Sequence, residues 1–186
     1  GQMMDFSRAG GGSRSVLSMG GVVQETLKMV NPTLPSSIHV DYSCDENLPC
    51  ISIDPVRLNQ IVMNLVINAR DALGEKGEIF VSIRPYERQC IEECLACHTV
   101  IEGDYVELAI TDRGTGIPQS ELKRIFEPFY TTKDVGKGTG MGLSVVHGIV
   151  HEYDGHILVY SEEGKGSTFR VLFKAIAPDK PSSDGN

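Results

Sequence analysis

The predicted strands of this chain come in adjacent pairs, and helical segments separate one pair from the next. Apolar residues alternate over 38–42, 51–53, 79–83, 105–110, 156–161 and 167–173, which predicts strands. Apolar residues at helical spacing predict helices over 21–30, 55–73, 118–125 and 141–153. Consecutive strands favour hairpins and a mixed or antiparallel sheet, and helices on one face would give a two-layer α/β sandwich. A doubly wound fold is disfavoured because strands and helices do not alternate one to one.

The length of 186 residues fits one domain with extra pieces at its ends. Residues 1–20 are predicted to be the end of an earlier helix followed by a Gly/Ser-rich linker. Residues 21–177 would form the domain. Residues 178–186 are rich in Pro, Ser and Asp, which predicts a disordered tail or a linker.

The net charge and the cysteine content limit the partners and the cellular compartment that we expect for this chain. A net charge of −8, from 25 acidic and 17 basic residues, disfavours nucleic acid as a partner. Five cysteines, an odd number without a signal-peptide pattern, favour reduced thiols in the cytosol. No stretch reaches the ~18–20 apolar residues that a membrane span needs.

The long helix predicted after Asp54-Pro55 carries an unusual polar face. Asn64, Asn68 and Asp71 follow one another at i, i+4 and i+7, and they adjoin the apolar stripe. Carboxamide and carboxylate oxygens one turn apart suit a hard divalent cation. A polar helix face whose amides are satisfied by neighbours fits the same pattern.

Asp112 comes at the end of a predicted strand and is followed by Gly114 and Gly116. Two glycines leave room for a ligand beside the carboxylate. A buried carboxylate needs hydrogen-bond donors, and the exocyclic amine of adenine is one. A tight turn with an Asx motif is the alternative interpretation.

Glycine occupies every second position from Gly136 to Gly142, immediately before a predicted helix. Backbone N–H groups in such a loop can turn toward an anion at the positive end of the helix. The spacing matches neither a Walker A loop nor a Rossmann fingerprint. A flexible glycine loop is the alternative interpretation. A fourth motif, Gly164-Lys165-Gly166, fits a simple hairpin turn. Ser167, which follows this turn, could bind a ligand base.

These four motifs, taken in order, resemble the catalytic and ATP-binding domain of a two-component sensor histidine kinase. This domain has the Bergerat ATP-binding fold, shared with gyrase, Hsp90 and MutL proteins. Residues 64–72 match the N box, 112–116 the first glycine box, 126–133 the F box, 138–143 the second glycine box and 164–166 the third. Residues 3–8 resemble the end of the dimerisation helices that precede this domain.

The resemblance implies a role for individual residues. Asn68 would coordinate Mg²⁺ on ATP, Asn64 would support the phosphates or the metal's waters, and Asp112, assisted by Ser167, would accept from adenine. Residues 118–140 would form a lid that Phe126 and Phe129 anchor to the core. The remaining residues implied in ATP binding are Asp71, Gly114, Gly116, Ile117, Lys133, Gly138, Thr139, Gly140, Met141, Gly142 and Leu143.

The implied activity is transfer of the γ-phosphoryl group of ATP to a histidine on an upstream dimerisation domain, and then to an aspartate of a response regulator. None of the five histidines stands in the acceptor's His-Glu or His-Asp setting, so we assign the acceptor to a segment outside this chain. The whole kinase would be a cytoplasmic or membrane-anchored homodimer. The alternatives are a non-catalytic module and an ATP-hydrolysing clamp of the gyrase, Hsp90 or MutL kind. In the clamps a glutamate occupies the position of Asn64.

A cysteine cluster lies outside these motifs. Cys90, Cys94, Cys97 and His98 have a spacing that fits three thiolates and one imidazole around Zn²⁺. Residues 94–98 also match a haem attachment pattern, which would need an exported setting. A reduced hairpin loop is the simplest interpretation, and the resemblance implies no metal here.

Overall fold

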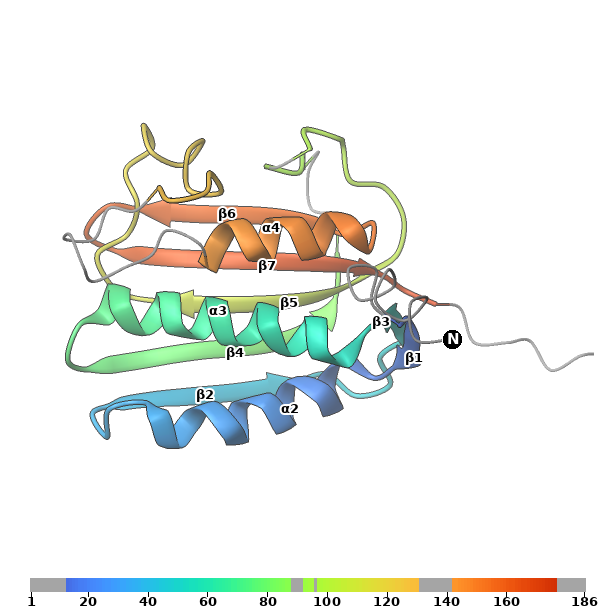
Figure 1. Ribbon diagram of the computed structural model, residues 1–186, viewed down its shortest axis with the longest axis horizontal. Helices are drawn as coiled ribbons and strands as arrows, with labels where there is room; N and C mark the ends of the chain where they lie inside the picture. The colour runs from blue at the N-terminus through green and yellow to red at the C-terminus, as the bar shows by residue number, and fades with distance from the viewer. Residues whose placement is uncertain (1–12, 88–91, 96, 131–141, 177–186) are drawn as a thin grey trace, which may run out of the picture.

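The computed structural model describes residues 13–87, 92–95, 97–130 and 142–176 (Figure 1). Within them the elements are, in chain order, β1 (Ser15–Leu17), α2 (Met19–Val30), a 3-10 turn η1 (Asn31–Thr33), β2 (Ile38–Cys44), β3 (Ile51–Ile53), α3 (Pro55–Leu73), β4 (Gly77–Pro85), β5 (Tyr105–Asp112), α4 (Gly142–Glu152), β6 (His156–Glu162) and β7 (Gly166–Lys174).

The main sheet has five strands in the order β2-β4-β5-β7-β6. β2 runs parallel to β4, and the other neighbouring strands are antiparallel, so the sheet is mixed, as predicted. The consecutive strands β4 and β5 pair with each other, and so do β6 and β7. The consecutive strands β2 and β3 do not pair, because β3 pairs with β1 in a separate two-stranded sheet.

Core packing explains this departure from the predicted hairpins. Ile51 and Ile53 of β3 are both fully buried. Cys50, just before them, forms a β-bridge with Ile176, just after β7. The short strand β3 is therefore held by apolar burial beside the end of β7 and not by a turn from β2.

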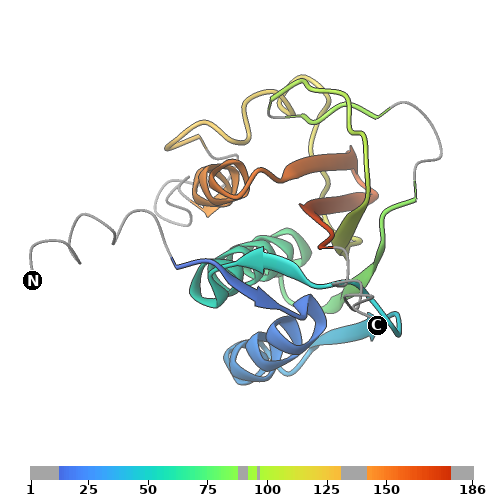
Figure 2. The ribbon, with the colours of Figure 1, turned by 90° about the vertical axis from the view of Figure 1, so that its right-hand side faces the viewer.

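The three α-helices among the described residues cover one face of the main sheet, which confirms the predicted two-layer α/β sandwich (Figure 2). α3 lies between α2 and α4 and packs against both. Its apolar stripe of Leu58, Ile61 and Leu65 is at most 1% exposed. The facing side of the sheet contributes the buried residues Ile79, Val81, Ile83, Val106, Leu108, Ile110, Phe169, Val171 and Phe173.

Local signals explain why α3 begins and ends where the sequence predicts. The side chain of Asp54 accepts a hydrogen bond from the backbone N–H of Val56 at 2.9 Å, which caps the first turn. Pro55 takes the first helical position, where no N–H is needed. Gly74 ends the helix with a φ of 78°, a conformation that glycine adopts without strain.

Two segments differ from their predictions. Residues 15–20, expected in a linker, form β1 and the first turn of α2, in which Met19 is 2% exposed. Residues 118–125, expected to be a helix, form successive turns, each closed by a bond three residues back, such as Arg124 N–H to Glu121 O at 2.8 Å. No helix among the described residues is both long and apolar enough to span a membrane.

Candidate functional site

Asp112 occupies the last position of β5 and is 3% exposed. The backbone N–H of Gly114 donates to its Oδ1 at 2.9 Å. Burial penalises the charged carboxylate and raises its pKa, while hydrogen bonds from the backbone N–H groups of Gly114 and Ser167 oppose the rise. The side chain is therefore a buried acceptor held in place by the backbone around it.

The two glycines after Asp112 allow close backbone contacts. A Cβ on Gly114 would lie 2.3 Å from the carbonyl oxygen of Ala72, and the neighbouring Thr115 N–H donates to that oxygen at 3.1 Å. Gly116 has a φ of 71°, and a Cβ there would lie 2.1 Å from the carbonyl oxygen of Glu162. The loop is thus pressed between the end of α3 and the β6–β7 turn.

Two serines extend this site onto β6 and β7. Ser167 lies opposite Asp112 across the β5–β7 pairing, as the predicted role requires. Its hydroxyl is 2.7 Å from that of Ser161, which also accepts from the backbone N–H of Ile117 at 2.7 Å. Sequence analysis missed Ser161. The feature that could have indicated Ser161 is a polar residue at a buried position of a strand. That feature is visible only when it is known which face of the strand is buried.

The polar face of α3 lies next to the start of α4. Asn64, Asn68 and Asp71 are each half-buried. A Cβ on Gly142 would lie 3.8 Å from Oδ1 of Asn64, which places α4's first residue beside that amide. The carboxylate of Asp71 is 3.1 Å from the guanidinium of Arg70.

The amide oxygens of Asn64 and Asn68 fit a hard cation. Among the described residues neither side chain has a hydrogen-bond partner. Half-buried amide oxygens can act as metal ligands, and oxygen donors suit Mg²⁺. The arrangement therefore fits a magnesium ion that is coordinated from α3.

Other predicted residues are divided between the described and the undescribed parts of the chain. Gly142 and Leu143 begin α4, and Leu143, like Ile117, packs against the edge of the core. Residues 131–140 of the predicted lid lie outside the described residues. So do five predicted ligand-binding residues, Lys133, Gly138, Thr139, Gly140 and Met141.

The two phenylalanines predicted to anchor the lid behave differently. Phe126 packs against the core, and its ring centroid is 5.6 Å from that of His147 on α4. Phe129 is 77% exposed, so its predicted anchoring role is wrong. Its backbone has a φ of 66° within the turn that the Tyr130 N–H closes onto Glu127 O at 3.2 Å.

With this geometry established, comparison with known proteins identifies the family. Residues 53–176 match the model of the histidine kinase-, DNA gyrase B- and HSP90-like ATPases. The chain belongs to this family of ATP-binding domains, as the order of its motifs predicted.

Curated relatives narrow the class further. The chain is 36% identical over 183 residues to the sensor kinase CckA of Brucella abortus, covering 98% of this chain and 19% of CckA. It is 37% identical over 151 residues to the sensor histidine kinase ZraS of Escherichia coli K12, covering 81% of this chain and 29% of ZraS. The chain thus spans less than a third of either relative.

Solved structures agree on the fold. Full-length ShkA in complex with AMPPNP is similar with a TM-score of 0.70 and 25% identity, over 90% of this chain and 32% of that one. The catalytic domain of histidine kinase ThkA has a TM-score of 0.69 and 25% identity, over 88% of this chain and 96% of that domain. The Bergerat fold and its place in histidine kinase catalytic domains are thereby confirmed.

Proposed function

We propose that this chain binds Mg-ATP and transfers the γ-phosphoryl group to a histidine on a dimerisation domain of the same kinase. The observation that carries the proposal is the buried carboxylate of Asp112, which lies opposite Ser167 and is followed by the loop of Gly114 and Gly116. A buried acceptor of this kind pairs with the exocyclic amine of adenine, because an uncompensated carboxylate would be costly in that place.

The phosphates would lie toward α3 and the start of α4. Asn68 and Asn64 offer amide oxygens there, and Gly142 opens α4 beside Asn64. The backbone N–H groups of the first turn of α4 have no partners within the helix, so they point at an approaching anion. Bound magnesium would neutralise phosphate charge, while the residues of α3 and α4 orient the phosphate chain.

One residue favours phosphoryl transfer to a side chain over hydrolysis of ATP. A clamp ATPase needs a general base to activate water, and Asn64 holds the position of that base. A carboxamide has no useful basicity at ordinary pH. Phosphoryl transfer needs mainly positioning and charge neutralisation, which the site supplies without a base of its own.

The proposal extends to the surroundings of the domain. The acceptor histidine would lie on dimerisation helices upstream of residues 1–20, and a receiver domain of a response regulator would take the phosphoryl group from it. Residues 21–177 would form the catalytic unit within a homodimeric kinase, on the cytoplasmic side where ATP is available. The names of the relatives, sensor kinase CckA and sensor histidine kinase ZraS, support the kinase part of this proposal.

Radiolabelled ATP tests the transfer directly. A longer protein that includes the upstream dimerisation helices should acquire acid-labile, base-stable label on a histidine. Asn68→Ala should abolish the label by removing a metal ligand, whereas Asn59→Ala, on the α2 side of the same helix, should retain it. Failure of the longer protein to label would contradict the kinase assignment.

Turnover by the 186-residue chain separates the two candidate functions. A kinase domain without its acceptor should release almost no phosphate from ATP. The position one turn before Asn68 is taken by Asn64, which cannot act as a base. Sustained hydrolysis by this chain, together with no labelling of the longer protein, would replace the kinase by the clamp.

A further inference from the structure

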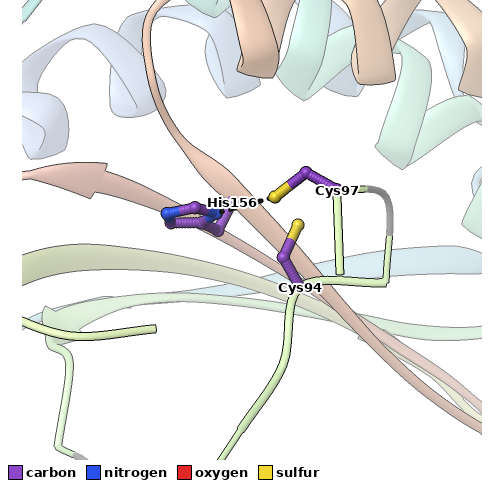
Figure 3. A group of neighbouring side chains, drawn as sticks. All are labelled: Cys94, Cys97 and His156. Carbon is purple, nitrogen blue, oxygen red and sulfur yellow. Dashed lines mark hydrogen bonds between the residues drawn. The ribbon is translucent and has the colours of Figure 1, made fainter. Parts of the chain in front are cut away.

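Two cysteines and a histidine meet at the outer edge of the sheet, away from the ATP site. Cys94 and Cys97 come from the connection between β4 and β5, and His156 is the first residue of β6. Figure 3 shows both sulfur atoms directed toward the His156 ring. Their ligand atoms all lie within 4.8 Å of one another, and Cys97 Sγ is 3.6 Å from Nδ1 of His156.

These separations fit a tetrahedral ion. Zinc binds sulfur at about 2.3 Å and imidazole nitrogen at about 2.0–2.1 Å, so a sulfur and a nitrogen on one zinc lie about 3.6 Å apart. The observed distance between Cys97 and His156 agrees with this value. Closing the whole cluster around an ion therefore needs only small movements of side chains.

The structure changes the ligand set that the sequence suggests. His98, adjacent to the cysteines in sequence, is exposed, and its Nδ1 lies 3.6 Å from a carboxylate oxygen of Glu93. Instead, the histidine at the cluster is His156, which follows Cys97 by 59 residues in the sequence. Cys90 lies outside the described residues.

The surroundings favour the thiolate form that metals bind. The backbone N–H of Ile157 donates to Cys94 Sγ at 3.3 Å, a contact that stabilises negative charge on sulfur.

His151, on the last turn of α4, supplies a candidate fourth ligand. Its Nδ1 lies 2.9 Å from the carbonyl oxygen of His147 and must donate to it, which leaves the lone pair on Nε2. Nε2 is buried without a hydrogen-bond partner among the described residues. The ring acts electrostatically on the Cys97 thiol, so it lies near that ligand, but its nitrogen atoms are not within 4.8 Å of all three ligand atoms, and the ring must turn toward the ion to bind it.

We propose that Cys94, Cys97, His156 and His151 form a structural zinc site. Two thiolates and two imidazoles are a common ligand set of closed, four-coordinate zinc. The outer ring nitrogen of His151 is already fixed by a backbone carbonyl, as is usual for a metal-bound histidine.

The position of the site indicates what zinc would do. His156 and Glu107 both stand at the level of Leu172, five residues along β5 from Asp112 and thus roughly 17 Å from the adenine site. The ion would fasten the β4–β5 connection to the exposed edge of β6 and to the end of α4. It would stabilise this end of the fold and leave nucleotide binding nearly unchanged, so the inference does not depend on the proposed function.

Two other uses of the cysteines fit less well. Haem attachment through residues 94–98 would need both thiols to reach a porphyrin, but Cys94 is fully buried beside Ile157. A Cys94–Cys97 disulfide would give a redox pair without metal, and it would leave His151 Nε2 unpartnered.

Metal analysis of the untagged chain, incubated with Zn²⁺ and passed over a weak chelating resin, tests the site. We expect about one equivalent of bound zinc. Cobalt in its place should give the strong visible bands of a tetrahedral ion and a thiolate-to-cobalt charge-transfer band. Less than about a tenth of an equivalent, or octahedral cobalt, would overturn the proposal.

Matched variants identify the ligands. Cys97→Ser, His156→Ala and His151→Ala should each weaken zinc binding at least about tenfold. His98→Ala and Cys44→Ser should bind zinc like the unchanged chain, since both side chains lie outside the cluster. Zinc loss in His98→Ala with retention in His156→Ala would refute the assignment. So would a zinc-free chain whose mass shows a Cys94–Cys97 disulfide. Circular dichroism would establish that each variant is folded.

Discussion

Gly114 holds Asp112 through its backbone N–H, which lies 2.9 Å from the carboxylate Oδ1. The same glycine lies so close to the carbonyl oxygen of Ala72 that no side chain fits between them. One residue therefore both orients the buried acceptor and joins its loop to the end of α3. The carboxylate that we propose binds adenine and the helix that carries Asn64 and Asn68 are coupled through this contact.

Exchange of Asp112 for asparagine should weaken ATP binding strongly. The variant Asp112→Asn keeps the shape and the acceptor oxygen, but its amide N–H group would face the amine of adenine. Spoiling one partner of a buried polar pair costs about 1–3 kcal/mol, which is about 5-fold to 150-fold in affinity. Calorimetric titration with Mg-ATP measures the loss.

A remote carboxylate provides the control for this experiment. Asp41→Asn, on the exposed side of β2, makes the same change of atoms away from the site and should leave affinity unchanged. If Asp112→Asn bound ATP as tightly as the unchanged chain, the assigned adenine site would be wrong.

The same variant should be more stable than the unchanged chain at neutral pH without nucleotide. The pKa of Asp112 is raised in the folded state, mainly by burial, so the folded state holds its proton more tightly than the unfolded state. Stability is therefore lost as pH rises from the ordinary Asp pKa through the raised one. Asn carries no charge and avoids this loss.

Thermal unfolding across pH tests the sign. The melting temperature of Asp112→Asn should exceed that of the unchanged chain at pH 7, and the difference should disappear below the ordinary Asp pKa, where both forms are neutral. A variant that is less stable at pH 7 would show that hydrogen bonds to the carboxylate outweigh its burial.

Local signals in the sequence predicted most of the fold. The cap at Asp54, the break at Gly74 and the apolar stripe between them defined α3, because each depends on neighbouring residues only. The pairing of β1 with β3 was not predictable in this way. It joins two three-residue strands 34 or more residues apart, too short to show a period, and burial of Ile51 and Ile53 fixes it.

The candidate ATP site was predicted where motifs lie in short, ordered runs, such as residues 64–72 and 112–116. Contacts between segments that are far apart in the sequence were not predicted. Ser161 joins Ile117 to Ser167, and His156 joins Cys97, only after β6 is placed beside β7 and the β4–β5 connection. Sequence spacing favoured His98 over His156 as a zinc ligand. Spacing along the chain reveals residues that are close in sequence, but not residues that the sheet brings together.

Gly116 and Gly164 give a matched pair for testing how tightly the site's loop is packed. Both have positive φ, 71° and 82°. A Cβ on Gly116 would lie 2.1 Å from the carbonyl oxygen of Glu162, whereas nothing lies within 4 Å of a Cβ on Gly164. Gly164→Ala should cost about 1–2 kcal/mol of unfolding free energy, from backbone strain alone. Gly116→Ala should cost at least about 3 kcal/mol, because backbone must also move.

Urea denaturation of the two variants measures this difference. Gly116→Ala should in addition weaken ATP binding, since the displaced loop carries Gly114 and its hold on Asp112. Equal destabilisation by the two substitutions would mean that the β6–β7 turn yields freely to a side chain.

A buried ion cluster on the other face of the sheet should contribute more stability than the surface ion pairs. Glu107 is 1% exposed, its Oε2 accepts from Arg84 Nε at 2.9 Å, and its Oε1 accepts from Arg170. Arg170 also contacts Glu92 at 2.8 Å, which ties the β4–β5 connection to β7. Neutralising this buried carboxylate removes the anion that Arg84 and Arg170 share and leaves Arg170 paired with Glu92, and we expect Glu107→Gln to cost about 2–4 kcal/mol of unfolding free energy.

The exposed pair of Glu25 and Lys28, 3.2 Å apart on α2, is the matched comparison. Glu25→Gln makes the same chemical change in water, where an ion pair contributes at most about 1 kcal/mol. Equilibrium unfolding in urea at low and high salt should show a large, nearly salt-independent loss for Glu107→Gln and a small, salt-sensitive one for Glu25→Gln. A loss below about 1 kcal/mol for Glu107→Gln would show that Arg84 and Arg170 find water as readily as a carboxylate.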